Sequence, residues 1–212
     1  MYMNKVFNIA ILAVAVFVAA LFVSCSNETD TTLNSQQKSI VDYLTKSHQP
    51  RLIAEADIEY SLEEKPNFYS QWGLNLFRYV STYYDEDRES KTQIESGDKI
   101  EIIYSAYIFS GSNPSISNLF ATNDQEKIAS LEAMELTPSS WWSTDVEEVT
   151  VGNDDDLLPA LSRALRGCYD GDSIEVYLTF EAAFGNKYVG MVPGKSAQVW
   201  YIDIKSVTKN KK

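Results

Sequence analysis

The sequence predicts an α+β fold with an antiparallel sheet, because apolar residues alternate in three segments and follow a helical pattern in a short segment between them. The alternating segments are residues 99–109, 173–179 and 198–207, and the helical segment is residues 157–166. Alternation of apolar and polar side chains is typical of strands that pack one face on a core. The order of strands, one short helix and further strands indicates the α+β class.

The first 24 residues have the pattern of a secretory signal. Lys5 supplies a positive charge, and residues 9–23 form an almost unbroken apolar run that is too short for an ordinary membrane-spanning helix. Ser24 stands directly before Cys25, which is typical of a lipoprotein signal that is cleaved at the cysteine. We therefore predict lipidation of Cys25 and attachment to a membrane through the lipid chains. A plain signal peptide and an uncleaved anchor are the alternatives.

The segment after the signal is first polar and then helical. Residues 25–35 are rich in serine, threonine and asparagine, which predicts a tether. Residues 36–71 form an N-terminal extension, and their first part, residues 36–47, has the apolar spacing of a short amphipathic helix. Residues 51–58 favour a strand.

The next elements belong to the sheet. The aromatic and β-branched residues of 68–84 predict a long strand that begins near Gly73. Residues 112–145 are the least regular part of the chain, with helical turns expected over residues 124–134, and residues 146–151 return to strand character.

A run of four polar residues, Asn153 and three aspartates, precedes the helix of residues 157–166. Its side chains are suited to capping the free amides of a helix, where negative charge is favourable. Pro159 suits the first turn and Gly167 the position after the last turn. Calcium binding is the alternative, although the spacing does not match a calcium loop.

Charge, cysteine and histidine content exclude several kinds of site. The net charge is −12, and removal of residues 1–24, which contain one lysine and no acid, gives −12 − 1 = −13. Such an acidic chain argues against nucleic acid as a partner. If Cys25 is lipidated, Cys168 has no disulfide partner; we expect it to be a small buried side chain, with a reactive thiol as the alternative. His48, the one histidine, is expected at the surface, so a zinc site or a catalytic triad has no basis.

Residues 97–111 and 157–207 resemble the two halves of an FKBP-type peptidyl-prolyl cis-trans isomerase domain. The first segment begins GDKIEIIY, which is similar to the Gly-Asp-x-Val-x-Val-x-Tyr strand of that family. The second contains GCYDGDSIEVYLTFEAAFG and VGMVPGKSAQVWYIDI, which resemble the later turns and strands of the family. The resemblance implies a curved antiparallel sheet wrapped around one short helix over residues 72–208, with an insertion near residues 112–145.

The resemblance also implies a pocket for proline between the helix and the concave face of the sheet. Its residues would be Tyr104, Phe120, Leu157, Leu158, Leu161, Phe184, Val192 and Trp200. The backbone N–H of Leu158 would donate a hydrogen bond to a carbonyl of the bound peptide. Packing in an ordinary core is the alternative for the aromatic residues of this set.

Three positions depart from the family. Ala121 stands where an aspartate is usual, Leu161 replaces a tryptophan, and Phe184 replaces a tyrosine. Two polar groups of the pocket are thus absent, while most of its apolar wall is retained. Rotation about an X-Pro bond requires no nucleophile, metal or cofactor, so an apolar pocket alone can accelerate it.

The sequence therefore predicts a membrane-anchored isomerase or folding helper of low activity that acts on proline-containing segments of exported proteins. Its expected location is the cell envelope of a Gram-negative-type bacterium, on the periplasmic side of either membrane or at the cell surface. The alternative is a catalytically inactive FKBP-like module. Such a module would bind a protein or glycan through Trp141, Trp142 and the insertion.

Overall fold

The computed structural model describes residues 31–138 and 142–211. The chain divides into two compact units, residues 1–35 and 36–212. In the first unit the described residues, 31–35, are helical, although they fall in the segment expected to be a tether. The predicted signal, the lipidation site Cys25 and Trp141 lie outside the described residues.

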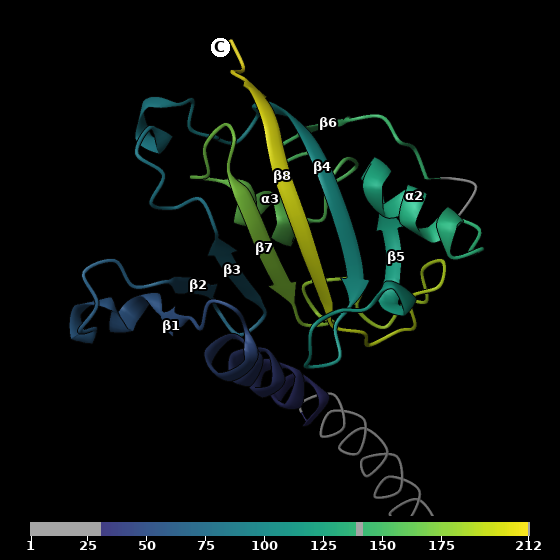
Figure 1. Ribbon diagram of the computed structural model, residues 1–212, viewed down its shortest axis with the longest axis horizontal. Coiled ribbons are helices and arrows are strands. Elements are labelled where there is room, and N and C mark those ends of the chain that lie inside the picture. The colour runs from purple at the N-terminus through teal and green to yellow at the C-terminus, as the bar shows by residue number, and fades with distance from the viewer. Residues whose placement is uncertain (1–30, 139–141, 212) are drawn as a thin grey trace, which may run out of the picture. The chain divides into compact units, whose positions relative to one another are not determined.

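The second unit is built on one eight-stranded sheet (Figure 1), in the order β1–β2–β3–β7–β8–β4–β5, with β6 paired to β4. The strands are β1 (Ile53–Ala54), β2 (Phe68–Trp72), β3 (Leu76–Val80), β4 (Lys99–Ile108), β5 (Leu119–Thr122), β6 (Glu147–Thr150), β7 (Ser173–Leu178) and β8 (Gln198–Thr208). Only β1 and β2 run parallel; every other pair in this sheet is antiparallel.

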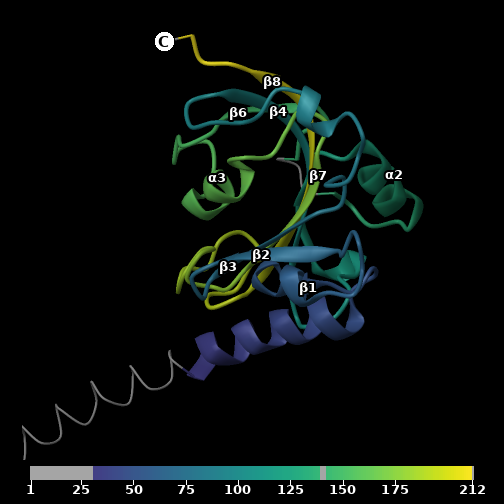
Figure 2. The same ribbon diagram turned by 90° about the vertical axis from the view of Figure 1, so that its left-hand side faces the viewer.

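Two α-helices lie on opposite sides of this sheet, as Figure 2 shows. They are α2 (Gln125–Ala133) and α3 (Pro159–Leu165). Residues 36–42 form a further helix that ends in the π-helical turn η1 (Tyr43–Ser47). Short 3-10 turns are η2 (Glu55–Tyr60), η3 (Arg88–Ser90) and η4 (Ile116–Asn118). The predicted fold class is confirmed: a curved, almost entirely antiparallel sheet surrounds the short helix α3, and a helical segment precedes it.

The core has one part on each face of the sheet. On one face, Leu161 and Leu165 of α3 pack against strand residues that include Val176 and Ile202. On the other face, Ile40 and Leu44 of the N-terminal helical segment pack against residues that include Tyr177 and Val199. Burial of a side chain of this size stabilises the fold by about 1.5–3 kcal/mol. The sheet therefore presents two different surfaces, each partly covered by a helix.

Two predicted strands are shorter than expected. In residues 68–84 the chain turns at Gly73, whose φ of 61° is unfavourable for residues with a side chain. The strand predicted to begin near Gly73 is β3, which ends at Val80 and is therefore shorter than expected. Trp72 and Leu76 are partners across its hairpin with β2, a strand that was not predicted. In residues 51–58 only Ile53–Ala54 is a strand, and the residues that follow form η2.

The prediction that aspartates cap α3 is also wrong. The N-cap residue of α3 is Leu158, and no side chain caps the helix there. Instead, Asp156 accepts a hydrogen bond from the Thr150 N–H at 2.9 Å, and Asn153 accepts one from the Asp155 N–H at 3.3 Å. The polar run thus stabilises the turn between β6 and α3, and Pro159 opens the helix as expected. Within residues 31–138 and 142–211 no group of three or more His, Cys, Asp or Glu side chains is arranged to hold a metal ion.

Cys168 lies where the sequence predicts, and His48 does not. Cys168 is fully buried, as predicted, and burial raises the pKa of its thiol to about 11. His48 is buried rather than exposed, because its ring fits between Tyr43 and Tyr79 and Nε2 lies 2.9 Å from Glu175 Oε2. The surface position expected for His48 is therefore wrong.

Candidate functional site

A cavity of about 260 Å³ lies where the start of α3 faces β4, β6 and β8. Alternate residues of a strand share a face, so Ile102 and Tyr104 of β4 point the same way, as do Trp200 and Ile202 of β8. The apolar part of the lining consists of Ile102, Tyr104, Val149, Leu157, Leu158, Leu161, Trp200 and Ile202. Strand alternation thus places apolar side chains of β4 and β8 on the face that lies beside the short helix α3.

Two aromatic rings form one wall of this cavity. The centroids of Tyr104 and Trp200 lie 5.5 Å apart, with ring planes inclined by 32°. The indole N–H of Trp200 donates to Gln198 Oε1 at 3.0 Å, which fixes the ring. Burial, reinforced by the nearby charge of Glu147, raises the pKa of Tyr104 to about 12. A hydrogen bond with Glu147 contributes to the same shift, so the Tyr104 hydroxyl is protonated at neutral pH and must exchange Glu147 for a ligand to donate to it.

The rim of the cavity is acidic. Its charged lining residues are Glu147, Asp154, Asp155 and Asp156. All four are exposed, and among the described residues no lysine, arginine or histidine lines the cavity. The hydrogen bond from the Thr150 N–H lowers the pKa of Asp156, which keeps that carboxylate ionised. The entrance therefore favours ligands that carry positive charge.

The structure brings five of the eight expected pocket residues to this cavity: Tyr104, Leu157, Leu158, Leu161 and Trp200. The other three, Phe120, Phe184 and Val192, belong to an adjoining apolar cluster around Ala106. Phe120 connects this cluster to the cavity wall, because its ring centroid lies 5.7 Å from that of Trp200 and 6.0 Å from that of Phe184. These three residues therefore lie behind Trp200 rather than in the lining of the cavity.

The backbone N–H of Leu158 faces no acceptor within the part of the chain that the structure describes, whereas the neighbouring Leu157 N–H donates to Asn153 O at 3.1 Å. The Leu158 N–H precedes the first turn of α3, where amides have no partner inside the helix. It is thus available to a carbonyl of a ligand in the cavity.

Seven lining residues were not expected in the pocket: Ile102, Glu147, Val149, Ile202 and the three aspartates 154–156, which were expected to cap the helix. Ile102 and Ile202 stand two residues from Tyr104 and Trp200 on the same strand faces, so alternation alone could have added them. Val149 and Glu147 reach the site because β6 pairs with β4, which places them opposite Ile100 and Ile102. No local sequence pattern predicts the pairing of β6 with β4.

Trp142 does not form an exposed platform. Its side chain is half-buried and packs against the core cluster on the face of the sheet remote from α3, and its indole nitrogen is buried. Within the described residues, no helix has both the length and the apolar character needed to cross a membrane.

No protein-family model matches this sequence, and no curated protein matches it. Among solved structures, the chain is similar to the crystal structure of the three FKBP domains of wheat FKBP73, with a TM-score of 0.47 and 13% sequence identity. The match covers 66% of this chain and 49% of that one, so the chain spans about half the length of that structure.

Proposed function

We propose that the protein binds proline-containing polypeptide segments in the cavity between α3 and the sheet and accelerates cis/trans isomerisation of X-Pro bonds, with low activity. The observation that carries the proposal is the cavity itself. Tyr104 and Trp200 wall it, apolar side chains from β4, β8 and α3 line it, and the unused Leu158 N–H lies at its edge.

The chemistry requires only differential binding. An X-Pro bond rotates over a barrier of about 18–20 kcal/mol because the twisted amide loses its resonance. The twisted amide is less charge-separated than the planar one, so an apolar site binds it better and lowers the barrier. The Leu158 N–H and the Tyr104 hydroxyl would orient the peptide by donating to its carbonyl groups.

Two positions explain why we expect low activity. Ala121 and Phe184 supply no polar group in the apolar cluster that Trp200 also packs against, where the resemblance predicts an aspartate and a tyrosine hydroxyl. Each absent hydrogen bond weakens binding or orientation by about 1–2 kcal/mol. A non-catalytic binding module is the second candidate, and the absence of these two groups is the observation that favours it.

The acidic rim suggests the kind of segment that binds. Glu147 and the aspartates of residues 154–156 attract lysine or arginine beside the proline and repel acidic neighbours. We further propose that the protein is attached to a membrane of the cell envelope through Cys25 and acts there on exported proteins, as the N-terminal sequence suggests.

The double variant Ala121→Asp/Phe184→Tyr tests the proposed activity. If the protein is an isomerase, supplying the missing carboxylate and hydroxyl should increase its rate of X-Pro isomerisation. NMR exchange spectroscopy on X-Pro peptides measures this rate. The matched control is Ala56→Asp/Phe68→Tyr, at positions away from the cavity. If the double variant folds and its rate equals that of the control, a non-catalytic binding module becomes the better supported of the two functions.

A further inference from the structure

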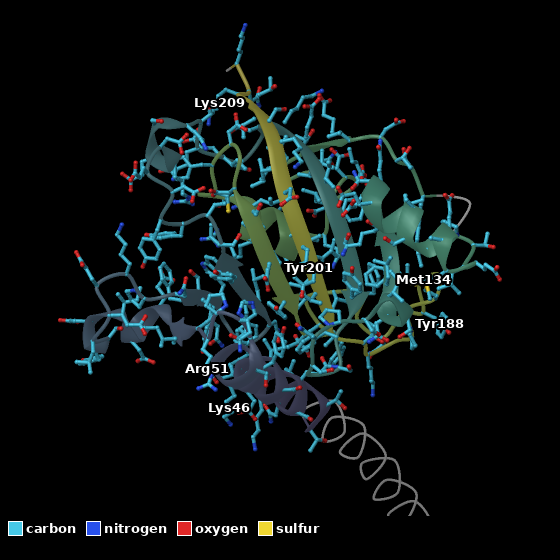
Figure 3. The ribbon with its side chains drawn as sticks, in the orientation of Figure 1. Lys46, Arg51, Met134, Tyr188, Tyr201 and Lys209 are labelled. Carbon is cyan, nitrogen blue, oxygen red and sulfur yellow. The ribbon has the colours of Figure 1, made fainter. Side chains whose placement is uncertain are left out.

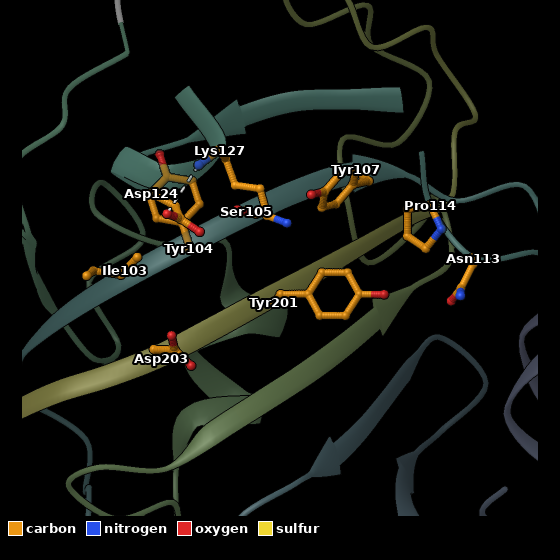
Figure 4. A pocket seen from close by; sticks show the side chains of 10 residues that line it. All are labelled: Ile103, Tyr104, Ser105, Tyr107, Asn113, Pro114, Asp124, Lys127, Tyr201 and Asp203. Atoms are coloured by element: carbon orange, nitrogen blue, oxygen red, sulfur yellow. Dashed lines mark hydrogen bonds between the residues drawn. The ribbon is translucent and has the colours of Figure 1, made fainter. Parts of the chain in front are cut away.

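The face of the sheet opposite α3 carries a second cavity, of about 350 Å³ (Figure 4). Ile103 and Ser105 of β4 and Tyr201 and Asp203 of β8 line it, each offset by one residue from the side chains of the first cavity. A one-residue offset reverses the direction of a strand side chain, so the two cavities open on opposite faces. The remaining lining residues are Tyr104, Tyr107, Asn113, Pro114, Asp124 and Lys127.

The floor of this cavity is aromatic. Tyr201 lies near the centre of the sheet (Figure 3), and Figure 4 shows its ring along β8 with the hydroxyl directed toward Asn113 and Pro114. The edge of the buried Tyr107 packs against it, with ring centroids 5.8 Å apart and planes at 86°. Burial, with the charge of Glu175, raises the pKa of Tyr201, so its hydroxyl is neutral. The cavity thus offers a partly exposed, fixed ring.

The walls are polar and partly fixed by hydrogen bonds. Asp203 Oδ1 accepts from Ser173 Oγ at 2.6 Å, and Asp124 Oδ1 accepts from the Glu126 N–H at 2.9 Å. The Asn113 amide is held through its oxygen by the Tyr43 hydroxyl. Within the described residues, Asp124 Oδ2, Asn113 Nδ2 and the Lys127 amine form no hydrogen bond. Acceptors and donors are therefore both available around the ring.

We propose that this cavity binds a saccharide ring. The C–H face of a sugar packs on an aromatic ring, while carboxylates accept hydrogen bonds from its hydroxyl groups, and an amide or amine donates to its oxygens. An apolar ligand would leave the remaining hydrogen-bonding capacity of Asp124 Oδ2 and Asn113 Nδ2 unused, whereas a sugar supplies hydroxyl groups to both. The volume lies at the small end of the range for ligand pockets, which suits one or two sugar units.

This site is independent of the proposed isomerase pocket. The two cavities share only Tyr104, and its ring belongs to the first cavity, where it pairs with Trp200. A saccharide and a peptide can therefore bind at the same time, and the saccharide site stands whether or not the protein is an isomerase.

The test is a titration of the purified protein with glucose, galactose, mannose and N-acetylglucosamine, followed by amide chemical shifts. We expect at least one of these sugars to shift the amide resonances of Ser105, Tyr201 and Asp203 and to leave those of Leu161 and Trp200 unchanged. Asp203→Asn keeps the size of the side chain and removes its charge, so it should weaken binding about tenfold. Tyr201→Phe keeps the ring and should retain most of the affinity.

Asp57→Asn is the matched control, because Asp57 is exposed on η2 and lines neither cavity. It should bind the sugar like the unmodified chain. The proposal is wrong if none of the four sugars shifts any resonance, if the shifts gather outside this cavity, or if folded Asp203→Asn binds as tightly as the control.

Discussion

Tyr104 and Trp200 lie on the neighbouring strands β4 and β8 with their ring centroids 5.5 Å apart, and together they form the aromatic wall of the cavity beside α3. Trp200 has a second contact on its other side, where the Phe120 ring packs at 5.7 Å and 80°. The tryptophan thus joins the cavity to the apolar cluster of Ala106, Phe120 and Val192. Tyr104 packs against the same cluster, so a variant that keeps its ring probes the cavity without disturbing this packing.

Tyr104→Phe removes one hydroxyl and leaves the aromatic wall in place. If that hydroxyl donates to the bound peptide, the variant should lose about five- to tenfold in kcat/KM for X-Pro isomerisation. Tyr60→Phe, at an exposed tyrosine, is the control and should keep the parent rate. Equal rates for the two variants would remove Tyr104 from the binding machinery.

The acidic rim should set a charge preference. Asp154→Asn/Asp155→Asn should reduce the preference for Lys-Pro over Glu-Pro peptides by about threefold, because exposed charges interact weakly. The difference should shrink as salt is added. Binding is read by fluorescence anisotropy of labelled peptides, so the result does not depend on catalysis. Glu63→Gln/Glu64→Gln, which removes two exposed charges elsewhere, should leave the preference unchanged.

A buried ion pair holds the loop before β4 to the turn before β7. The Arg88 guanidinium binds Asp172 through two hydrogen bonds of 2.8 Å, and it stacks on the rings of Tyr83 and Tyr169. Arg88→Met leaves the buried Asp172 carboxylate with hydrogen bonds from Thr82 and Tyr169 but without a counter-ion, so the free energy of unfolding should fall by about 3–5 kcal/mol. Urea denaturation measures this loss, and the exposed Arg51→Met should lose almost nothing.

Stability should depend on pH through His48. Burial alone would lower the pKa of His48, but its hydrogen bonds to Glu175 and Pro50 and the charge of Glu175 outweigh burial and raise it. A raised pKa stabilises the folded protein fully below the unfolded value of about 6.5, and this contribution is lost as pH rises through the folded value.

His48→Gln should therefore reduce the free energy of unfolding more at acidic pH than at alkaline pH. Urea titrations of the parent and variant across this pH range test the prediction. Lys38→Gln, at an exposed side chain of the same helical segment, is the control. A His48→Gln effect that is the same at every pH would show that the ring acts only by packing.

Much of the site could be predicted from local pattern. Alternation along residues 99–109 and 198–207 predicted two strands, the family resemblance placed Tyr104 and Trp200 of these strands in one pocket, and Pro159 marked the start of α3. What failed depends on contacts distant in sequence. His48 is buried because it meets Glu175, which lies 127 residues away.

A contact between strands distant in sequence also brings Glu147 to the acidic rim. Glu147 reaches the cavity through the pairing of β6 with β4, which no local pattern encodes. The turn at Gly73, by contrast, could have been predicted, since a glycine between two apolar runs is a common hairpin signal.

The most direct test of the central claim is NMR exchange spectroscopy of X-Pro peptides with the purified protein and its Leu158→Asp variant. Leu158 is the N-cap of α3, where aspartate is favourable, so the variant should fold while placing a charge in the apolar cavity. Faster exchange with the parent, reduced in the variant, is the expected result. Exchange no faster than in buffer, with a folded parent protein at high concentration, would contradict the proposed isomerase.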